Sequence, residues 1–284
     1  MRGFVALAAF AATGVSFFAA STARAFVDFS MPAPTVVAHY DFGQLNTDDS
    51  LDLPTPGSIY SNVDTFSGFA AANGGTVVNA GNGNLLTTRY LADDLNSAGG
   101  SFDVMSVAGW SMKFSVANLN AAATTARFRI RFFLRDGAGG APGTALGGFS
   151  FATTSIPTGV STFTATNLGS LGAGIPPSGT TQIWAGMFFD NSGAAATTAA
   201  QLDNLGQGLF NPPVIGTSAD QDFLSGAATN TFLVNNPAGA VRPSPFAANP
   251  VANYGWEITP APEPTSLAVL GLSIMGFTLR RRRI

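Results

Sequence analysis

Cysteine is absent from the 284-residue chain, and histidine and lysine occur once each, as His39 and Lys113. Without thiols, the chain cannot form disulfide bridges, thiolate-based zinc or iron–sulfur sites, or a catalytic cysteine. With one imidazole, histidine-rich metal sites are excluded, and a Ser-His-Asp arrangement would depend on His39 alone. A large packed core must therefore supply the stability.

Charged residues of the helix-forming kind are also scarce. Between the two ends of the chain, Glu257 is the only glutamate, whereas the chain has 33 glycines and 24 phenylalanines, with abundant Val and Thr. This composition is typical of an all-β domain with many turns.

The N-terminus has the pattern of a secretory signal peptide. Arg2 precedes an apolar run from Phe4 to about Ala20, and Ala23 and Ala25 fit the small-x-small rule for signal peptidase. We expect residues 1–25 to be removed. The alternative is a short N-terminal membrane helix.

The C-terminus combines three features in a fixed order. A Pro-Glu-Pro triplet precedes the uncharged stretch Thr265–Leu279, and four arginines follow. Fifteen helical residues span about 22 Å, less than the ~30 Å hydrocarbon core, and the arginines should stay cytoplasmic. The residues of the predicted signal are Pro262, Glu263, Pro264, Arg280, Arg281, Arg282 and Arg283. The alternative is a permanent C-terminal anchor.

This order resembles the PEP-CTERM protein-sorting signal. The resemblance implies that an exosortase processes the chain, which is transiently anchored in the inner membrane and then reaches the cell surface or the extracellular space. It also implies an association with exopolysaccharide. We therefore divide the chain into a signal peptide (1–25), a secreted body (26–259) and a sorting signal with a short transmembrane helix (260–284).

The body is acidic. It keeps seven basic and fifteen acidic residues once both targeting segments are set aside, a net charge of about −8. Nucleic-acid binding and electrostatic docking on anionic lipid both need a basic surface, so we expect neither.

Arg127–Arg135 is the clearest predicted strand. Phe128, Ile130, Phe132 and Leu134 alternate with arginines, which predicts one buried face and one exposed basic face. That basic face would either bind an acidic polymer or, as we prefer, be solvated and paired with aspartates. Further short strands, separated by Gly, Pro, Asn and Asp, are predicted at residues 35–42, 65–71, 75–79, 84–90, 109–116, 146–153, 161–166, 182–190, 230–234 and 254–259.

These strands predict an antiparallel β-sandwich. The segments Ala92–Asn96, Trp110–Phe114, Phe132–Thr144 and Ile183–Asp190 resemble a β-sandwich domain found in front of surface anchors, which implies a jelly-roll-like fold and no established chemistry.

Candidate sites in the body are few. Asp48, Asp49 and Asp52, the Asp93–Asp94 pair, Asp190 with Asn191, and Asp220 with Asp222 have calcium-type ligands, and no single loop stands out, so the metal site stays unknown. Asp136–Thr144 lacks the Gly-Lys-Ser/Thr ending of a phosphate loop and is predicted to be a turn.

Three function classes remain. The first is a structural or adhesive component of the cell surface, extracellular matrix or biofilm, and the alternative is a non-catalytic carbohydrate-binding module that uses exposed aromatics such as Tyr60, Tyr90 or Trp184. A hydrolase is the weakest class. The spacing of the acids in the sequence does not indicate a catalytic pair, and no Gly-x-Ser-x-Gly elbow is present. We expect no enzyme activity, no catalytic residue and no cofactor apart from the open calcium question.

Overall fold

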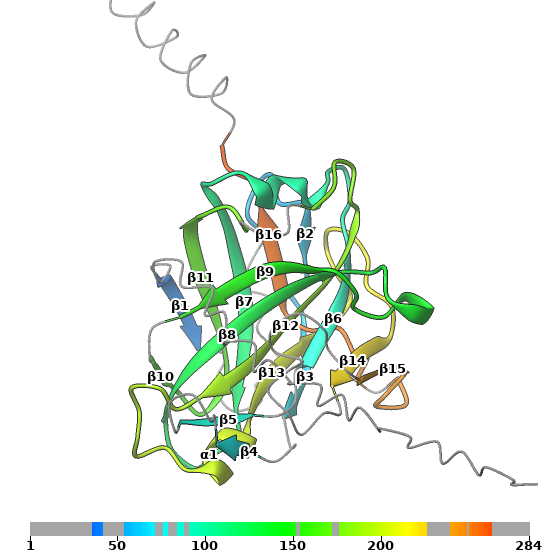
Figure 1. Cartoon of the computed structure of the whole chain (residues 1–284). Coiled ribbons are helices and arrows are strands. Elements are labelled where there is room, and N and C mark those ends of the chain that lie inside the picture. Colours follow the sequence, from blue (N-terminus) through cyan, green and yellow to red (C-terminus); the bar gives the residue numbers. More distant parts are fainter. Residues whose placement is uncertain are drawn as a thin grey trace, which may run out of the picture.

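Two antiparallel sheets packed face to face form the body of the protein, as predicted (Figure 1). The computed structural model describes residues 36–41, 54–71, 76–78, 84–87, 91–151, 154–171, 176–225, 239–248 and 250–262. One sheet has seven strands in the order β1-β11-β7-β13-β3, with β16 next to β7 and β2 next to β16. The other has nine, with the path β10-β8-β12-β6-β14-β15, and β4, β5 and β9 join it at the sides.

Most strands are short, as expected from the spacing of the turn residues, and the longest has 11 residues. The seven-stranded sheet contains β1 (Val36–Asp41), β2 (Tyr60–Ser61), β3 (Phe66–Ala71), β7 (Trp110–Asn118), β11 (Gly159–Leu168), β13 (Leu205–Phe210) and β16 (Trp256–Thr259). The nine-stranded sheet contains β4 (Thr76–Val78), β5 (Leu85–Thr87), β6 (Leu91–Asn96), β8 (Thr124–Leu134), β9 (Ala145–Ser150), β10 (Thr154–Ile156), β12 (Gln182–Asp190), β14 (Gln221–Ser225) and β15 (Gly239–Pro243). The helices are α1 (Ala199–Asp203) and two 3₁₀ turns, Phe102–Ser106 and Ala138–Gly140.

Most predicted strands are present, and β12 has the predicted bounds. The prediction missed β6, β13, β14 and β15, among others. Two adjacent aspartates interrupt the apolar pattern of β6, and two glycines interrupt that of β13, so neither has a clear period of two. The predicted strand at residues 230–234 lies outside the described residues.

The main core lies between the two sheets. β7 places Trp110, Met112, Phe114 and Val116 on its inner face, and their neighbours Ser111, Lys113 and Ser115 point the other way, which is the period-two pattern of a strand. Phe114 packs edge-on against Phe128 of β8, with ring centroids 5.4 Å apart, and stacks on Phe163 of β11 at 5.8 Å. The first of these contacts joins the two sheets, and the second lies within the seven-stranded sheet.

The arginine face of β8 is buried, and the prediction of a solvated basic face is wrong. Phe128, Ile130 and Phe132 point into the core as predicted, but on the opposite face Arg129 and Arg131 are only 2% and 1% exposed. Both faces of the central part of this strand are therefore removed from water.

A second apolar cluster explains this burial. Phe133, Trp184, Phe188 and Phe223 pack together on the outer face of the nine-stranded sheet, away from the main core. The guanidinium of Arg131 lies 5.8 Å from the centre of the Phe188 ring, and the Trp184 Nε1–H donates to the Gly140 carbonyl of the loop after β8. Aromatic residues and a loop contact thus lie on the outer face of β8, which the alternation of the sequence predicted to be exposed.

Candidate functional site

The last strand of the body leads directly into the predicted sorting signal. β16 pairs with β2 on one side and with β7 on the other, so Trp256–Thr259 are held within the sheet. The described chain ends three residues later at Pro262, which is exposed. Glu263, Pro264, the four arginines and the cleavage residues Ala23 and Ala25 lie outside the described residues.

β16 also contains half of a buried ion pair. The Lys113 ammonium on β7 lies 3.6 Å from a carboxylate oxygen of Glu257, directly opposite in the register. Glu257 also accepts hydrogen bonds from the Ser61 hydroxyl (2.9 Å) and the Thr55 amide (3.2 Å). The sole lysine of the chain and the sole glutamate of the body thus serve to fix the C-terminal strand.

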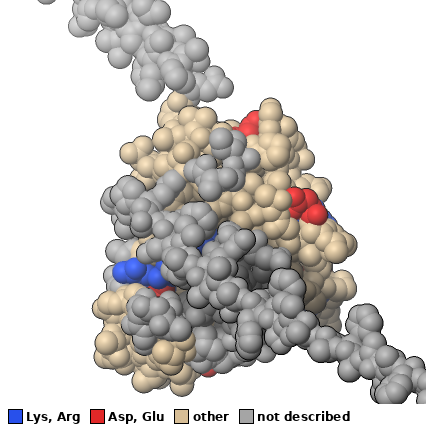
Figure 2. All heavy atoms as spheres, viewed as in Figure 1, with Lys and Arg blue, Asp and Glu red and all other residues tan. Residues whose placement is uncertain are grey.

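Three more ion pairs occupy most of the other described cations. Arg129 pairs with Asp190, Arg135 with Asp94, and Arg242 with Asp222. Each of the three aspartate side chains is at most 3% exposed. On the face shown in Figure 2, few charged side chains of the described residues reach the surface. Four of the described cations are thus used for internal pairing.

The two adjacent aspartates of β6 share one hydroxyl. Ser218 Oγ lies 2.7 Å from Asp93 Oδ1 and 3.3 Å from Asp94 Oδ1. Asp93 also accepts from the Tyr254 amide at 2.8 Å and is fully buried. Burial, and then the charge of Asp94, raise the pKa of Asp93 well above its usual value. Burial also raises the pKa of Asp94, against the opposing charge of Arg135.

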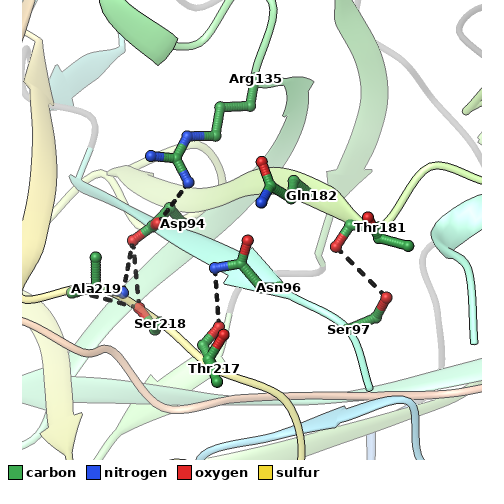
Figure 3. Close-up of a pocket in the computed structure, with 9 residues that line it drawn as sticks. All are labelled: Asp94, Asn96, Ser97, Arg135, Thr181, Gln182, Thr217, Ser218 and Ala219. Atoms are coloured by element: carbon green, nitrogen blue, oxygen red, sulfur yellow. Dashed lines mark hydrogen bonds and ion pairs between the residues drawn. The ribbon is translucent and has the colours of Figure 1, made fainter. Parts of the chain in front are cut away.

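A polar cleft of about 440 Å³ lies at the end of β6, beside the start of β12 (Figure 3). Arg135 Nη1 donates to Asp94 Oδ2 at 2.9 Å on one wall, and Asn96 Nδ2 donates to the Thr217 carbonyl at 3.1 Å on another. The lining residues are Asp94, Asn96, Ser97, Arg135, Thr181, Gln182, Thr217, Ser218 and Ala219.

Two of the aromatic residues predicted to bind carbohydrate do not reach the surface. Tyr60 and Trp184 are both fully buried, Tyr60 in the main core and Trp184 in the outer cluster, so this prediction was wrong for both. Tyr90 lies outside the described residues. Large aromatic side chains pack by default where two layers can cover them, and here even the outer face of the sheet is covered.

The glycine-rich loop is a turn, as predicted. Asp136 Oδ1 accepts from the Thr144 amide at 2.7 Å, and Oδ2 accepts from the Thr144 hydroxyl at 2.6 Å, which closes the loop. A Cβ atom on Gly143 would lie 2.0 Å from Asp136 Oδ1, so only glycine fits there.

No calcium site is found in the part of the chain that the structure describes. No group of three or more His, Asp or Glu side chains in this part is placed to hold a metal ion. Asp94, Asp190 and Asp222 each pair with an arginine instead. Asp48, Asp49 and Asp52 lie outside the described residues.

The cleft residues were only partly visible in the sequence. Asp94 and Asn96 belong to the segment Ala92–Asn96, which resembles part of a β-sandwich domain, but no motif singles out Gln182, Ser97 or Ser218. The position of Gln182 was a possible signal, because Gln182 begins the predicted strand 182–190 and residues at strand ends often line clefts. Their meeting depends on the pairing of β6 with β12 and on the bridge that joins Asn96 to Thr217, neither of which the sequence shows.

No helix among the described residues is long and apolar enough to cross a membrane. Comparison with known families matches residues 260–283 to the PEP-CTERM protein-sorting motif. The chain therefore has the C-terminal signal of an exosortase substrate, that is, of an exported protein sorted to the cell surface. No curated protein and no solved structure was found to match the chain.

Proposed function

We propose that the body of this exosortase-sorted protein is a non-catalytic structural or adhesive component, associated with exopolysaccharide or biofilm. Signal peptidase removes residues 1–25, the tail anchors the chain briefly in the inner membrane, and exosortase cleavage then delivers the folded sandwich to the cell surface or the extracellular matrix. The carbohydrate-binding alternative loses the aromatic residues that supported it, because Tyr60 and Trp184 are buried.

The direct connection between β16 and the sorting motif carries this proposal. The motif begins at residue 260, immediately after a strand that is hydrogen-bonded on both sides. A force applied at the C-terminus would have to shear Trp256–Thr259 away from β2 and β7 and separate Glu257 from Lys113. A surface protein that holds cells or polymer in place needs such a link.

The use of the charged side chains supports a non-catalytic role. Asp94 is the one acid among the residues that line the cleft, and its neighbour Asp93 is fully buried. Glycoside hydrolysis by the usual mechanism needs two carboxyl groups that flank the substrate. The described acids with the lowest exposure are instead held by arginine, lysine or hydroxyl partners.

The test compares a deletion strain of the producing organism with strains that carry the wild-type gene or a variant with Ala at Pro262, Glu263 and Pro264. We expect to find the wild-type protein in the matrix fraction, with an intact mass that corresponds to a chain ending near Thr265. We also expect the deletion strain to lose adhesion. The variant should keep Arg280–Arg283 and stay with the membrane.

Two outcomes would contradict the proposal. A matrix-fraction protein that retains Arg280–Arg283 would rule out the processing step and favour a permanent anchor. Unchanged adhesion in the deletion strain, although the wild-type strain displays the protein, would rule out the adhesive role.

A further inference from the structure

We propose that the polar cleft at the end of β6 is a carbohydrate-binding site, in which Arg135, Gln182 and the surrounding hydroxyls hold the sugar by hydrogen bonds. The inference depends on the proposed adhesive function for its biological setting, but its geometry is independent of the sorting signal.

The composition of the cleft selects the class of ligand. Eight of its nine lining residues have a polar side chain, and Ala219 is the exception. They comprise one carboxylate, one guanidinium, two amides and four hydroxyls, which together offer both donors and acceptors. Each hydroxyl of a sugar can also donate and accept, so a polyhydroxylated ligand can satisfy such a surface, whereas an apolar ligand would leave it unpaired.

The ion pair at the wall supplies a fixed, partly open donor group. Asp94 is 1% exposed and already accepts from Arg135, Ser218 and the Ala219 amide. The Arg135 side chain is 27% exposed, and its bond to Asp94 uses Nη1. Because arginine has five N–H donors in a rigid fork, further donors remain for ligand oxygens, and Asp94 holds the fork in place.

The opposite side of the cleft supplies groups that can adapt to a ligand. Gln182 and Thr181 are exposed at the start of β12, and Figure 3 shows Gln182 between Arg135 and Asn96. Ser97 is fixed by hydrogen bonds to the carbonyls of Gly100 and Thr181. The cleft thus combines the Asp94–Arg135 ion pair with an exposed amide on β12.

The size of the cleft agrees with this assignment, and its lining predicts modest affinity. A volume of about 440 Å³ is in the range of small-ligand sites. None of the lining residues is aromatic, so stacking does not contribute to the affinity of a single site. Many copies displayed on one surface would raise the overall affinity without any new contact.

The experiment titrates protein purified after export from the producing cells against an immobilised panel of neutral, uronic-acid and amino-sugar oligosaccharides. Three variants accompany the wild type. Gln182→Ala removes an exposed cleft amide, and Arg135→Ala removes the guanidinium. Arg242→Ala is the matched control, because Arg242 is also a partly exposed arginine, paired with the buried Asp222, but lies outside the cleft.

We expect the wild type to bind at least one sugar class, Arg135→Ala and Gln182→Ala to bind at least about tenfold more weakly, and Arg242→Ala to bind within about twofold of the wild type. Thermal melts of all four proteins separate lost contacts from lost folding. The proposal is overturned if the wild type binds no member of the panel, if Gln182→Ala binds as well as the wild type, or if Arg135→Ala and Arg242→Ala weaken binding equally. Any of these results, with adhesion still lost in the deletion strain, would leave the proposed function standing.

Discussion

Truncation of Arg129 to Ala tests the burial of both faces of β8. An exposed arginine can be removed at a cost below about 1 kcal/mol, since surface ion pairs contribute little. Arg129 is 2% exposed, however, and its Nε donates to Asp190, whose side chain is 3% exposed. The variant would leave the Asp190 carboxylate buried without its counter-charge.

The expected loss is therefore large. Breaking a buried ion pair by removal of one partner costs about 3–5 kcal/mol. Asp190 would keep one hydrogen bond, from the Ser192 amide to Oδ1 at 2.8 Å, which favours the lower end of that range. A loss of 3 kcal/mol changes the unfolding equilibrium more than a hundredfold, and it is a large part of the 5–15 kcal/mol of a typical domain.

Denaturant melts of the purified protein measure this loss against two reference variants. Ile130→Ala, on the core face of the same strand, should cost about 2–5 kcal/mol, because Ile130 is fully buried. Thr125→Ala, at an exposed position of β8, should stay within about 0.5 kcal/mol of wild type. If Arg129→Ala proves as mild as Thr125→Ala, the outer face of β8 is open to water and the reasoning fails.

Three further predictions concern other charged groups. Because burial raises the pKa of Asp93, the native state binds more protons than the unfolded chain. This contribution to stability should be complete below about pH 4 and lost as pH rises through the native pKa. Asp93→Asn, which does not titrate and keeps an oxygen that can accept from the Tyr254 amide, should flatten the pH dependence of the melts, and an unchanged slope would refute the assignment. Lys113→Met should cost about 3 kcal/mol because it leaves Glu257 buried, and the double variant with Glu257→Gln should recover part of that loss in a double-mutant cycle. Hydrolysis of generic esters and of the host polysaccharide should be absent in both wild type and His39→Ala, and activity that the substitution abolishes in a folded protein would make this an enzyme.

Local pattern was sufficient for several strands and for the tail. The alternation in Phe128–Leu134 predicted β8 and its core face, since side chains of a strand point alternately to its two sides, and residues 109–116 were predicted as a strand, which is β7. The tail needed no fold at all. A peptidase recognises a short linear segment, so the order Pro-Glu-Pro, apolar stretch and arginines is informative by itself, and residues 260–283 match the sorting motif.

Whether the second face of a strand is buried or exposed was decided only by the tertiary structure. Alternation separates the two faces but does not say whether a loop or another layer covers the polar one. Here Phe188 of the outer cluster lies against Arg131, the loop after β8 contacts Trp184, and the buried Arg129 pairs with Asp190 of another strand.

The cleft depended on tertiary structure for the same reason. Asp94, Arg135, Gln182 and Ser218 are spread over more than a hundred residues of sequence and meet only because β6 pairs with β12 and the loop before β14 folds against both. The sequence by itself determined the core face of β8 and, through the sorting motif, where the protein is sent. Long-range pairing decided which polar groups became buried pairs and which were left to line a site, because that depends on the neighbours that the fold brings to each of them.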